Sequence, residues 1–276
     1  MRGSPCRIED SMDRWFHIAE QLFRAEAQAM FYVLLGISGI TLLECFIPAE
    51  TGQGWVGRAR NIAYLLQLKL FGVLAIAAWY AWGPAVDGVK VDVGSLPTAL
   101  LVVANLVAID LLYYFYHRAQ HRFRFLWAIH ELHHADAELN ATSSYRTYWL
   151  EAPVQLVLVF TPTVVLFGSL GPKHGLIVLC VSLFFLIFSH ANLRLHLGPL
   201  TGWVIGPQVH RVHHSRLPGH RDQNFAQYFP FLDRLFGTFH PPAHDEFPPT
   251  GAEGLASDAP LWTALTAPFR IWLSRN

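Results

Sequence analysis

Eight of the fifteen histidines in this chain fall into three clusters whose spacing is typical of metal ligands on helices. The clusters read HRAQH, HELHH and HRVHH, and their members are His117 and His121, then His130, His133 and His134, then His210, His213 and His214. Positions i, i+3 and i+4 of an α-helix lie on one face, so each cluster presents its imidazoles as a single patch. Imidazole is a common ligand of first-row transition metals. A zinc ion usually takes about four ligands, so this many nitrogens predict two metal ions.

For any single histidine, the alternative is a hydrogen-bonded residue on an apolar helix without a metal. Three clusters at ligand spacing, two of them with the same HxxHH pattern, favour the metal interpretation. The cysteines are scattered along the chain, at Cys6, Cys45 and Cys180, and none lies near a cluster. The sequence therefore argues against a thiolate-bound zinc or iron–sulfur site, and it offers no disulfide framework.

The composition indicates an integral membrane protein. Hydrophobic residues make up 53% of the chain and charged residues 14%, and the mean hydropathy is +0.29. A helix needs about 20 apolar residues to cross a bilayer. Apolar runs that approach or reach this length lie at residues 27–47, 62–82, 96–116, 152–170 and 176–189, of which the last is short and the second is interrupted by Lys69. We therefore predict an all-α fold with about four to five transmembrane helices and a helical cap that holds a histidine-rich di-metal site.

Connecting these runs brings all three histidine clusters to one face of the membrane. The third run ends directly at His117, and the fourth and fifth runs leave and return to the same side, where they deliver His190. Arginines gather on this side, whereas the opposite loops carry Lys90 and Lys173, so the positive-inside rule predicts that the histidines face the cytoplasm. His174 lies on the opposite side and is excluded as a ligand. The absence of a basic tract gives no reason to expect nucleic acid as a partner. The predicted regions are an amphipathic N-terminal segment (1–26), a membrane-embedded domain (27–240) and a C-terminal tail (241–276).

Several motifs, taken in order, resemble those of one known family. Residues 110–121 read DLLYYFYHRAQH, and residues 130–146 read HELHHADAELNATSSYR. They are followed by FSHANLRL (188–195), PQVHRVHHSR (207–216), DQNF (222–225) and LDRLFGTF (232–239). Over about residues 30–240 the chain is thus similar to the fatty acid hydroxylase/sterol desaturase superfamily of integral membrane di-metal oxygenases. It departs from the family pattern at Tyr148, where many members have a histidine, and at Ala226 and Leu232, where a glycine and a tryptophan are common.

The resemblance implies a non-haem di-iron site that uses O2 to hydroxylate or desaturate a C–H bond of a lipid, such as a sterol or a fatty-acyl chain. It implies a lipid substrate from the bilayer and two iron ions, which zinc can replace in purified samples. Nothing in the sequence resembles a dinucleotide, flavin or haem site, so electrons are expected from a separate electron-transfer protein. The alternatives are a membrane acyl desaturase or carotenoid hydroxylase/ketolase, and a non-oxygenase zinc-binding membrane protein. The HRxxH, HxN and DRLFGT elements favour the first assignment.

On this resemblance, the expected metal ligands are the eight clustered histidines together with His190, which the HxN motif supports. His196, six residues further on, is a candidate ligand that the motif leaves undecided. Ligand histidines usually donate their second ring N–H to a carboxylate or carbonyl, and an acid inside a membrane span is a functional candidate. We therefore expect Asp110 and Asn192 to support the ligands, with a structural bond to another helix as the alternative for Asp110. Further candidates for this supporting role are Glu151, Asp222 and Asn224. Histidines expected at the surface or behind the ligands are His17, His220, His240 and His244.

Overall fold

The computed structural model describes residues 8–82, 96–168 and 171–274. Within these ranges the regular structure is helical, and strands are absent apart from two isolated bridges, Pro48–Leu193 and Ser215–Thr250. The prediction of an all-α fold with a histidine-rich cap is therefore confirmed. Lys90, which the orientation argument used, lies outside the described residues.

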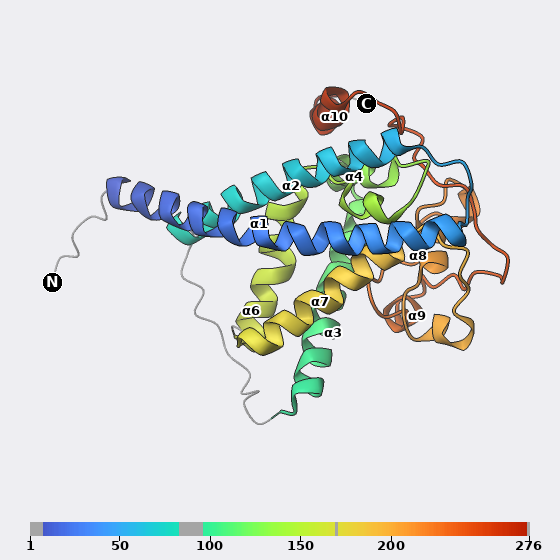
Figure 1. Cartoon of the computed structure of the whole chain (residues 1–276), viewed down its shortest axis with the longest axis horizontal. Helices are drawn as coiled ribbons and strands as arrows, with labels where there is room; N and C mark the ends of the chain where they lie inside the picture. Colours follow the sequence, from blue (N-terminus) through green and yellow to red (C-terminus); the bar gives the residue numbers. More distant parts are fainter. Residues whose placement is uncertain (1–7, 83–95, 169–170, 275–276) are drawn as a thin grey trace.

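Three helices are long and apolar enough to cross a membrane: α1 (Ile8–Phe46), α2 (Trp55–Trp82) and α3 (Thr98–Arg122). α1 and α2 pack side by side (Figure 1). The outer faces of these two helices expose large apolar side chains, among them Phe31, Leu35, Leu66 and Tyr80. Exposed apolar surface of this extent fits contact with lipid, where intrahelical hydrogen bonds satisfy the backbone. The helix α1 is continuous across residue 26, so the N-terminal segment and the first apolar run share one helix.

The fourth and fifth apolar runs form shorter helices. One consists of α5 (Glu151–Gln155), the π-helical turn η2 (Leu156–Phe160) and α6 (Thr161–Phe167), and the other is α7 (Pro172–Ser189). Pro162 has no backbone N–H, so one α-helical bond is missing at this place. In the wider turn the Leu156 carbonyl accepts both the backbone N–H and, at 2.8 Å, the hydroxyl of Thr161. The described residues thus contain three long and two short apolar helices.

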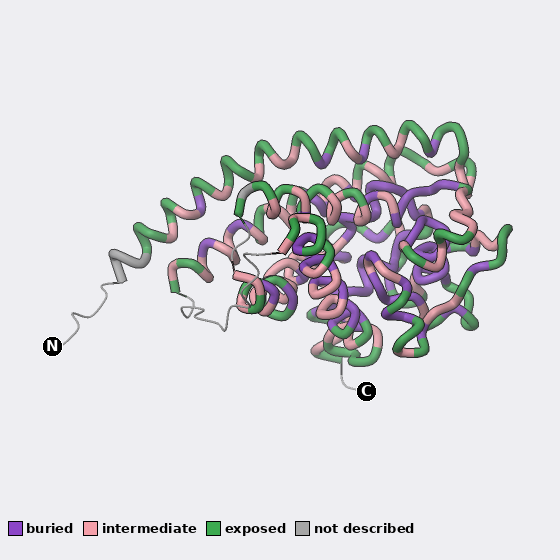
Figure 2. Tube along the Cα trace, turned by 90° about the horizontal axis from the view of Figure 1, so that it is seen from below, coloured by how far each residue is buried: buried purple, intermediate pink, exposed green. Residues whose placement is uncertain are grey.

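Short helices form a cap at the end of the molecule where α1 ends and α2 begins (Figure 1). They are α4 (Arg124–His134), η1 (Ala141–Tyr145), η3 (Gly198–Gly202), α8 (Pro207–His213), η4 (Pro218–His220), α9 (Phe231–Leu235) and α10 (Leu261–Leu273). Buried residues concentrate in this cap (Figure 2). The helix α10 packs against α4, and both share a core with Tyr64 and Tyr148. Residues on either side of the predicted boundary at 240 therefore belong to one packed unit.

Buried charged side chains hold the loops of the cap. Glu44, near the end of α1, accepts hydrogen bonds from the backbone N–H groups of Ala141 and Asn192, both at 2.8 Å. The same carboxylate pairs with Arg58 at 2.7 Å. On the α10 side of the cap, the buried guanidinium of Arg146 donates to two backbone carbonyls, at 3.1 and 2.9 Å. A buried polar group without a partner costs about 1–3 kcal/mol, so these side chains make the irregular loops of the cap possible.

Candidate metal centre

Nine histidines from four parts of the chain meet in the cap. His117 and His121 lie on the last turns of α3, three more lie on α4, His190 directly follows α7, and three lie on α8 and the residue after it. All but His121 are buried, with at most 7% of each residue exposed. The nine histidines form two groups, and within each group the ligand-type nitrogens lie within 4.8 Å of one another.

Both HxxHH motifs contribute to both groups. The five-histidine group consists of His117, His121, His130, His134 and His213, and the four-histidine group consists of His133, His190, His210 and His214. From α4, His130 and His134 belong to the first group and His133 belongs to the second. From α8 and the residue after it, His213 belongs to the first group, and His210 and His214 belong to the second. Adjacent residues on a helix point about 100° apart, so consecutive histidines reach different groups. Each motif therefore connects the two metal positions that the sequence predicts.

The imidazole Nε2 atoms face one another at short distances. In the four-histidine group, His190 Nε2 lies 3.1 Å from the Nε2 atoms of both His133 and His210. In the five-histidine group, the corresponding distances are 3.1 and 3.2 Å, from His134 Nε2 to those of His121 and His130. Two nitrogens that bind one metal ion at about 2.0–2.1 Å lie about 2.9–3.4 Å apart in octahedral or tetrahedral geometry. The observed separations fit ligands that share an ion.

Backbone carbonyls fix the tautomer of three of these histidines. The Nδ1 atoms of His117, His190 and His213 lie 2.9, 2.8 and 2.8 Å from the carbonyl oxygens of residues 225, 186 and 223, respectively. A carbonyl oxygen only accepts, so Nδ1 carries the proton and Nε2 keeps its lone pair. The Nε2 atoms of His117 and His213 are buried without a hydrogen-bond partner. Buried lone pairs of this kind fit the ligands of a metal ion.

Burial favours the uncharged form of the grouped histidines on α4 and α8 and of His190. Desolvation lowers the pKa of His190 to about 4 and the pKa of His213 to about 3. It also lowers the pKa of every other histidine ligand on α4 and α8 well below the usual range, and neighbouring imidazoles add to this effect. Only the neutral imidazole offers a lone pair to a metal. Near neutral pH these groups can therefore bind a cation without first releasing protons.

Asp110 contacts none of the histidines directly. Its buried carboxylate accepts hydrogen bonds from the three backbone N–H groups of residues 227–229, at 2.7–3.1 Å. The chain just before them carries the Phe225 carbonyl that binds His117. Asp233 holds the same segment from α9, because it accepts the Phe225 N–H at 2.7 Å. The sequence interpretation missed Asp233, although its place in the DRLFGT motif was a signal for it.

Asn192 also acts on the backbone. Its side chain exchanges two hydrogen bonds with the main chain of Glu50, at 2.7 and 3.0 Å. It thereby ties the residues after His190 to the loop between α1 and α2. His196 lies in neither histidine group, and its ring packs against that of His244 with the centroids 4.8 Å apart.

The loop after α8 supports the five-histidine group through strained backbone. Asp222 and Asn224 have φ angles of 57° and 55°, in the left-handed region that non-glycine residues rarely adopt. The carboxylate of Asp222 lies 3.5 Å from His121 Nδ1, and the hydrogen bond to His121 lowers the pKa of Asp222. Between these two residues, the Gln223 carbonyl binds His213. The strained backbone thus lies where the Asp222 carboxylate and the Gln223 carbonyl contact two histidines of this group.

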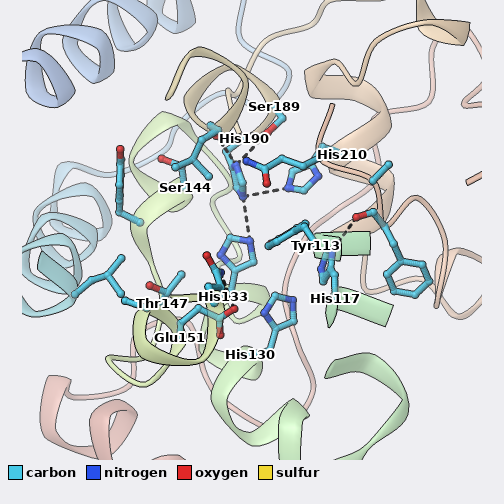
Figure 3. Close-up of a pocket in the computed structure, with 18 residues that line it drawn as sticks. Tyr113, His117, His130, His133, Ser144, Thr147, Glu151, Ser189, His190 and His210 are labelled. Atoms are coloured by element: carbon cyan, nitrogen blue, oxygen red, sulfur yellow. Dashed lines mark hydrogen bonds between the residues drawn. The ribbon is translucent and has the colours of Figure 1, made fainter. Parts of the chain in front are cut away.

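Several cavities border the grouped histidines, and two of them share no lining residue. The smaller, of about 130 Å³, is lined by ligands from both groups and by apolar side chains such as Leu68, Leu186 and Phe225 (Figure 3). The larger, of about 690 Å³, lies at the edge of the five-histidine group beside His121 and His134. Its other lining residues include Arg122, Arg124, Arg216 and Arg221. The lining of the larger cavity is thus strongly charged, with four arginines beside the acids Glu131, Asp222 and Glu253, whereas apolar side chains contribute much of the smaller one.

Known proteins resemble the chain in the region that builds this centre. The sequence model of the fatty acid hydroxylase family matches residues 102–238, which include all nine histidines. The ornithine lipid hydroxylase of Rhizobium tropici is 30% identical over 261 residues, which cover 90% of this chain and 78% of that protein. Alkylglycerol monooxygenases from Xenopus tropicalis and Homo sapiens are 31% and 30% identical over 138 and 133 residues. These matches cover 50% and 48% of this chain but only 30% and 29% of those proteins. No solved structure was found to match the chain.

Alanine at one ligand of each group should separate the two metal positions. We expect His213→Ala and His133→Ala each to lower the metal content of the detergent-purified protein by about one ion per chain, because each removes one of the few nitrogens that an ion can bind. Elemental analysis by mass spectrometry measures this content. His174→Ala is the matched control, since its ring lies 3.3 Å from the Thr98 hydroxyl and outside both groups. Equal losses in all three variants would contradict the assignment.

Asp110→Asn tests whether the hydrogen bonds between Asp110 and the backbone of residues 227–229 help the histidines to bind metal. An amide presents a donor where the carboxylate accepts, so at least one of the three backbone hydrogen bonds is lost. We expect metal affinity to fall about 10- to 100-fold, as for other changes behind metal ligands, measured by competition with a chelator. Asp258→Asn, at an exposed carboxylate of the cap, is the control. Unchanged affinity with a lower melting temperature would assign Asp110 to packing alone.

Proposed function

Since the chain belongs to the fatty acid hydroxylase family, we propose that it is an integral membrane hydroxylase that inserts oxygen from O2 into a C–H bond of a lipid. The three long apolar helices support the membrane location. We assign one iron ion to each histidine group, and bound iron supplies the redox chemistry that activates O2. The neutral imidazoles and the fixed tautomers of His117, His190 and His213 support this assignment.

The small cavity is the observation that carries this proposal. Its wall contains His117 and His130 of the five-histidine group and His133, His190 and His210 of the four-histidine group. Figure 3 shows these imidazoles around one space. Apolar side chains, among them Leu68 and Leu186, line another part of its wall. A hydrocarbon segment bound in this space lies against ligands of both metal positions. Burial of the imidazoles also keeps bulk water away from the reacting carbon.

The size of the cavity favours a linear chain as the substrate. About 130 Å³ is well below the roughly 300–1,000 Å³ of pockets that enclose drug-sized ligands. A short stretch of an alkyl or acyl chain fits such a space better than the fused rings of a sterol. Relatives of the chain are named for alkylglycerol and for ornithine lipid. We therefore propose a polar lipid with an alkyl or acyl chain that enters from the bilayer.

Hydroxylation is favoured over desaturation and over a non-oxygenase role. Relatives of the chain are named as a hydroxylase and as monooxygenases. A carotenoid hydroxylase/ketolase would need a wider space for the ring of its substrate than the cavity of about 130 Å³ provides. A zinc-binding membrane protein without oxygenase activity would not require a cavity bordered by both histidine groups and apolar side chains.

Electrons for the reaction come, in this proposal, from a separate protein. The large cavity reaches His121, His134 and His213 without passing through the small one. Exposed arginines line it, namely Arg122, Arg124, Arg216 and Arg221. A carrier with an acidic surface would be attracted to this side of the centre. Lipid and electron donor therefore approach the histidines from different directions.

We further propose that the cap faces the cytoplasm. The cap carries most of the arginines, whereas Lys173 lies at the far end of α7. The bias in Lys and Arg between the two sides of a membrane sets the orientation of most multi-span proteins. On this assignment the large cavity opens to soluble electron donors of the cell.

Labelling of single cysteines tests this orientation. In a background with Cys6, Cys45 and Cys180 changed to serine, Arg124→Cys and Pro218→Cys should react with a membrane-impermeant maleimide only from the cytoplasmic side. Lys173→Cys should react only from the other side, because it lies at the opposite end of α7. All three positions are exposed, so each reagent can reach its target. Reaction of the Arg124 and Pro218 positions from different sides would contradict the placement of the cap.

Isotope transfer tests the chemistry. We expect product only when O2, a reductant and an electron-transfer protein are all present, and ¹⁸O2 should place label in the product alcohol while H2¹⁸O should not. Lipids from cells with and without the gene, compared by mass spectrometry, supply the candidate substrate. His133→Ala should abolish product and His174→Ala should retain it, because only the first residue lies in a histidine group. Product formed without O2, or label that arrives from water, would exclude the hydroxylase assignment.

A further inference from the structure

A third set of ligand-type side chains lies in the cap, apart from both histidine groups. His220 at the end of η4, His240 after α9 and Glu246 in the following loop each place one nitrogen or oxygen within 4.8 Å of the others. Glu246 Oε1 lies 2.9 Å from His220 Nε2 and 3.5 Å from His240 Nε2. The two imidazole centroids are 5.0 Å apart. Because these residues come from three separate segments, only the tertiary fold brings them together.

Two of these side chains are oriented by additional hydrogen bonds. His220 Nδ1 lies 3.0 Å from the hydroxyl of Ser215, which leaves Nε2 directed at Glu246. The second carboxylate oxygen of Glu246 accepts the backbone N–H of Ala243 at 2.8 Å. Metal-binding histidines and carboxylates in proteins are commonly held in this way by a partner at their other polar atom.

The loop that carries Glu246 is fastened to the helix with the last histidine cluster. The side-chain amide of Gln208, in the first turn of α8, donates to the carbonyls of Ala243, His244 and Glu246 at 2.8, 3.0 and 3.1 Å. Gln208 itself is buried, at 2% exposed. Glu246 therefore has a fixed position relative to α8, while His220 and His240 belong to the loops that follow this helix.

We propose that His220, His240 and Glu246 bind a third divalent cation, of the zinc class, separate from the two histidine groups. Two imidazoles and one carboxylate with an open fourth position suit Zn²⁺. Ligand atoms around a tetrahedral zinc ion lie about 3.4 Å apart, close to the 2.9 and 3.5 Å found here. The side chains of His240 and Glu246 are 31% and 24% exposed, so water can fill the fourth position. The cation joins three loop segments of the cap.

Zinc stoichiometry of the full chain tests this site. The detergent-purified protein is equilibrated with Zn²⁺ in excess, desalted and measured by elemental mass spectrometry. We expect Glu246→Gln and His240→Ala each to hold about one ion less per chain than the unchanged protein, since each removes a ligand of the third site. Combined with His133→Ala, either change should lower the content by about two ions, because the two sites share no residue.

Matched controls come from the same loop. Asp245→Asn changes an exposed carboxylate beside Glu246, and His244→Ala changes an exposed imidazole, so both should keep the third ion. Equal zinc content in the unchanged protein, Glu246→Gln and His240→Ala would overturn the proposal, and His220 and Glu246 would be a hydrogen-bonded pair without a metal. The same loss in Asp245→Asn would also overturn it. Loss of the histidine-group ions together with the third ion, in both site variants, would overturn its independence from those groups.

Discussion

The structure depends on one electrostatic constraint, which is the convergence of nine uncharged imidazoles in two groups. Nitrogen lone pairs that face one another at about 3 Å repel unless a proton or a cation lies between them. Carbonyls hold the protons of His117, His190 and His213 on the far side of their rings. The inner nitrogens of His117 and His213 have no hydrogen-bond partner among the described residues, so a bound cation would satisfy them. The burial of the histidines and the division of each HxxHH motif between the groups both serve this arrangement.

Two acids of the apolar helices bind backbone N–H groups of the cap, while backbone carbonyls bind several of the imidazoles. Glu44 on α1 and Asp110 on α3 each accept two or more N–H groups from loops that carry or follow ligands. Asp233 does the same from α9. These loops are irregular, so their amides have no partners within a helix, and buried amides without partners are costly. A carboxylate can accept several such bonds at once, which explains why acids are found in otherwise apolar segments.

The sequence predicts those features that depend on local spacing. The helical periodicity of HxxxH and HxxHH identifies the clusters, and apolar runs predict the helices that present them. The sequence does not predict that His133 joins a different group from His130 and His134, since this depends on how α3, α4 and α8 cross in space. The partner of Asp110 was equally hidden, because it is a stretch of backbone more than a hundred residues further on. His220, His240 and Glu246 show no helical spacing in the sequence, since they come from separate segments of the cap.

Under the proposed function, the position of His117 on α3 has a consequence for which carbons of a lipid chain react. His117 follows Thr98, the first residue of α3, by 19 residues, or about 29 Å along the helix axis. The hydrocarbon layer of a bilayer is about 30 Å thick, so an α3 that crosses it from Thr98 would place the histidines at its boundary and not at its middle. A lipid that stays in the adjoining leaflet presents at this depth the carbons nearest its headgroup, while its chain end lies about 15 Å deeper. On the proposed function, the length of α3 would therefore favour reaction at carbons close to the membrane surface.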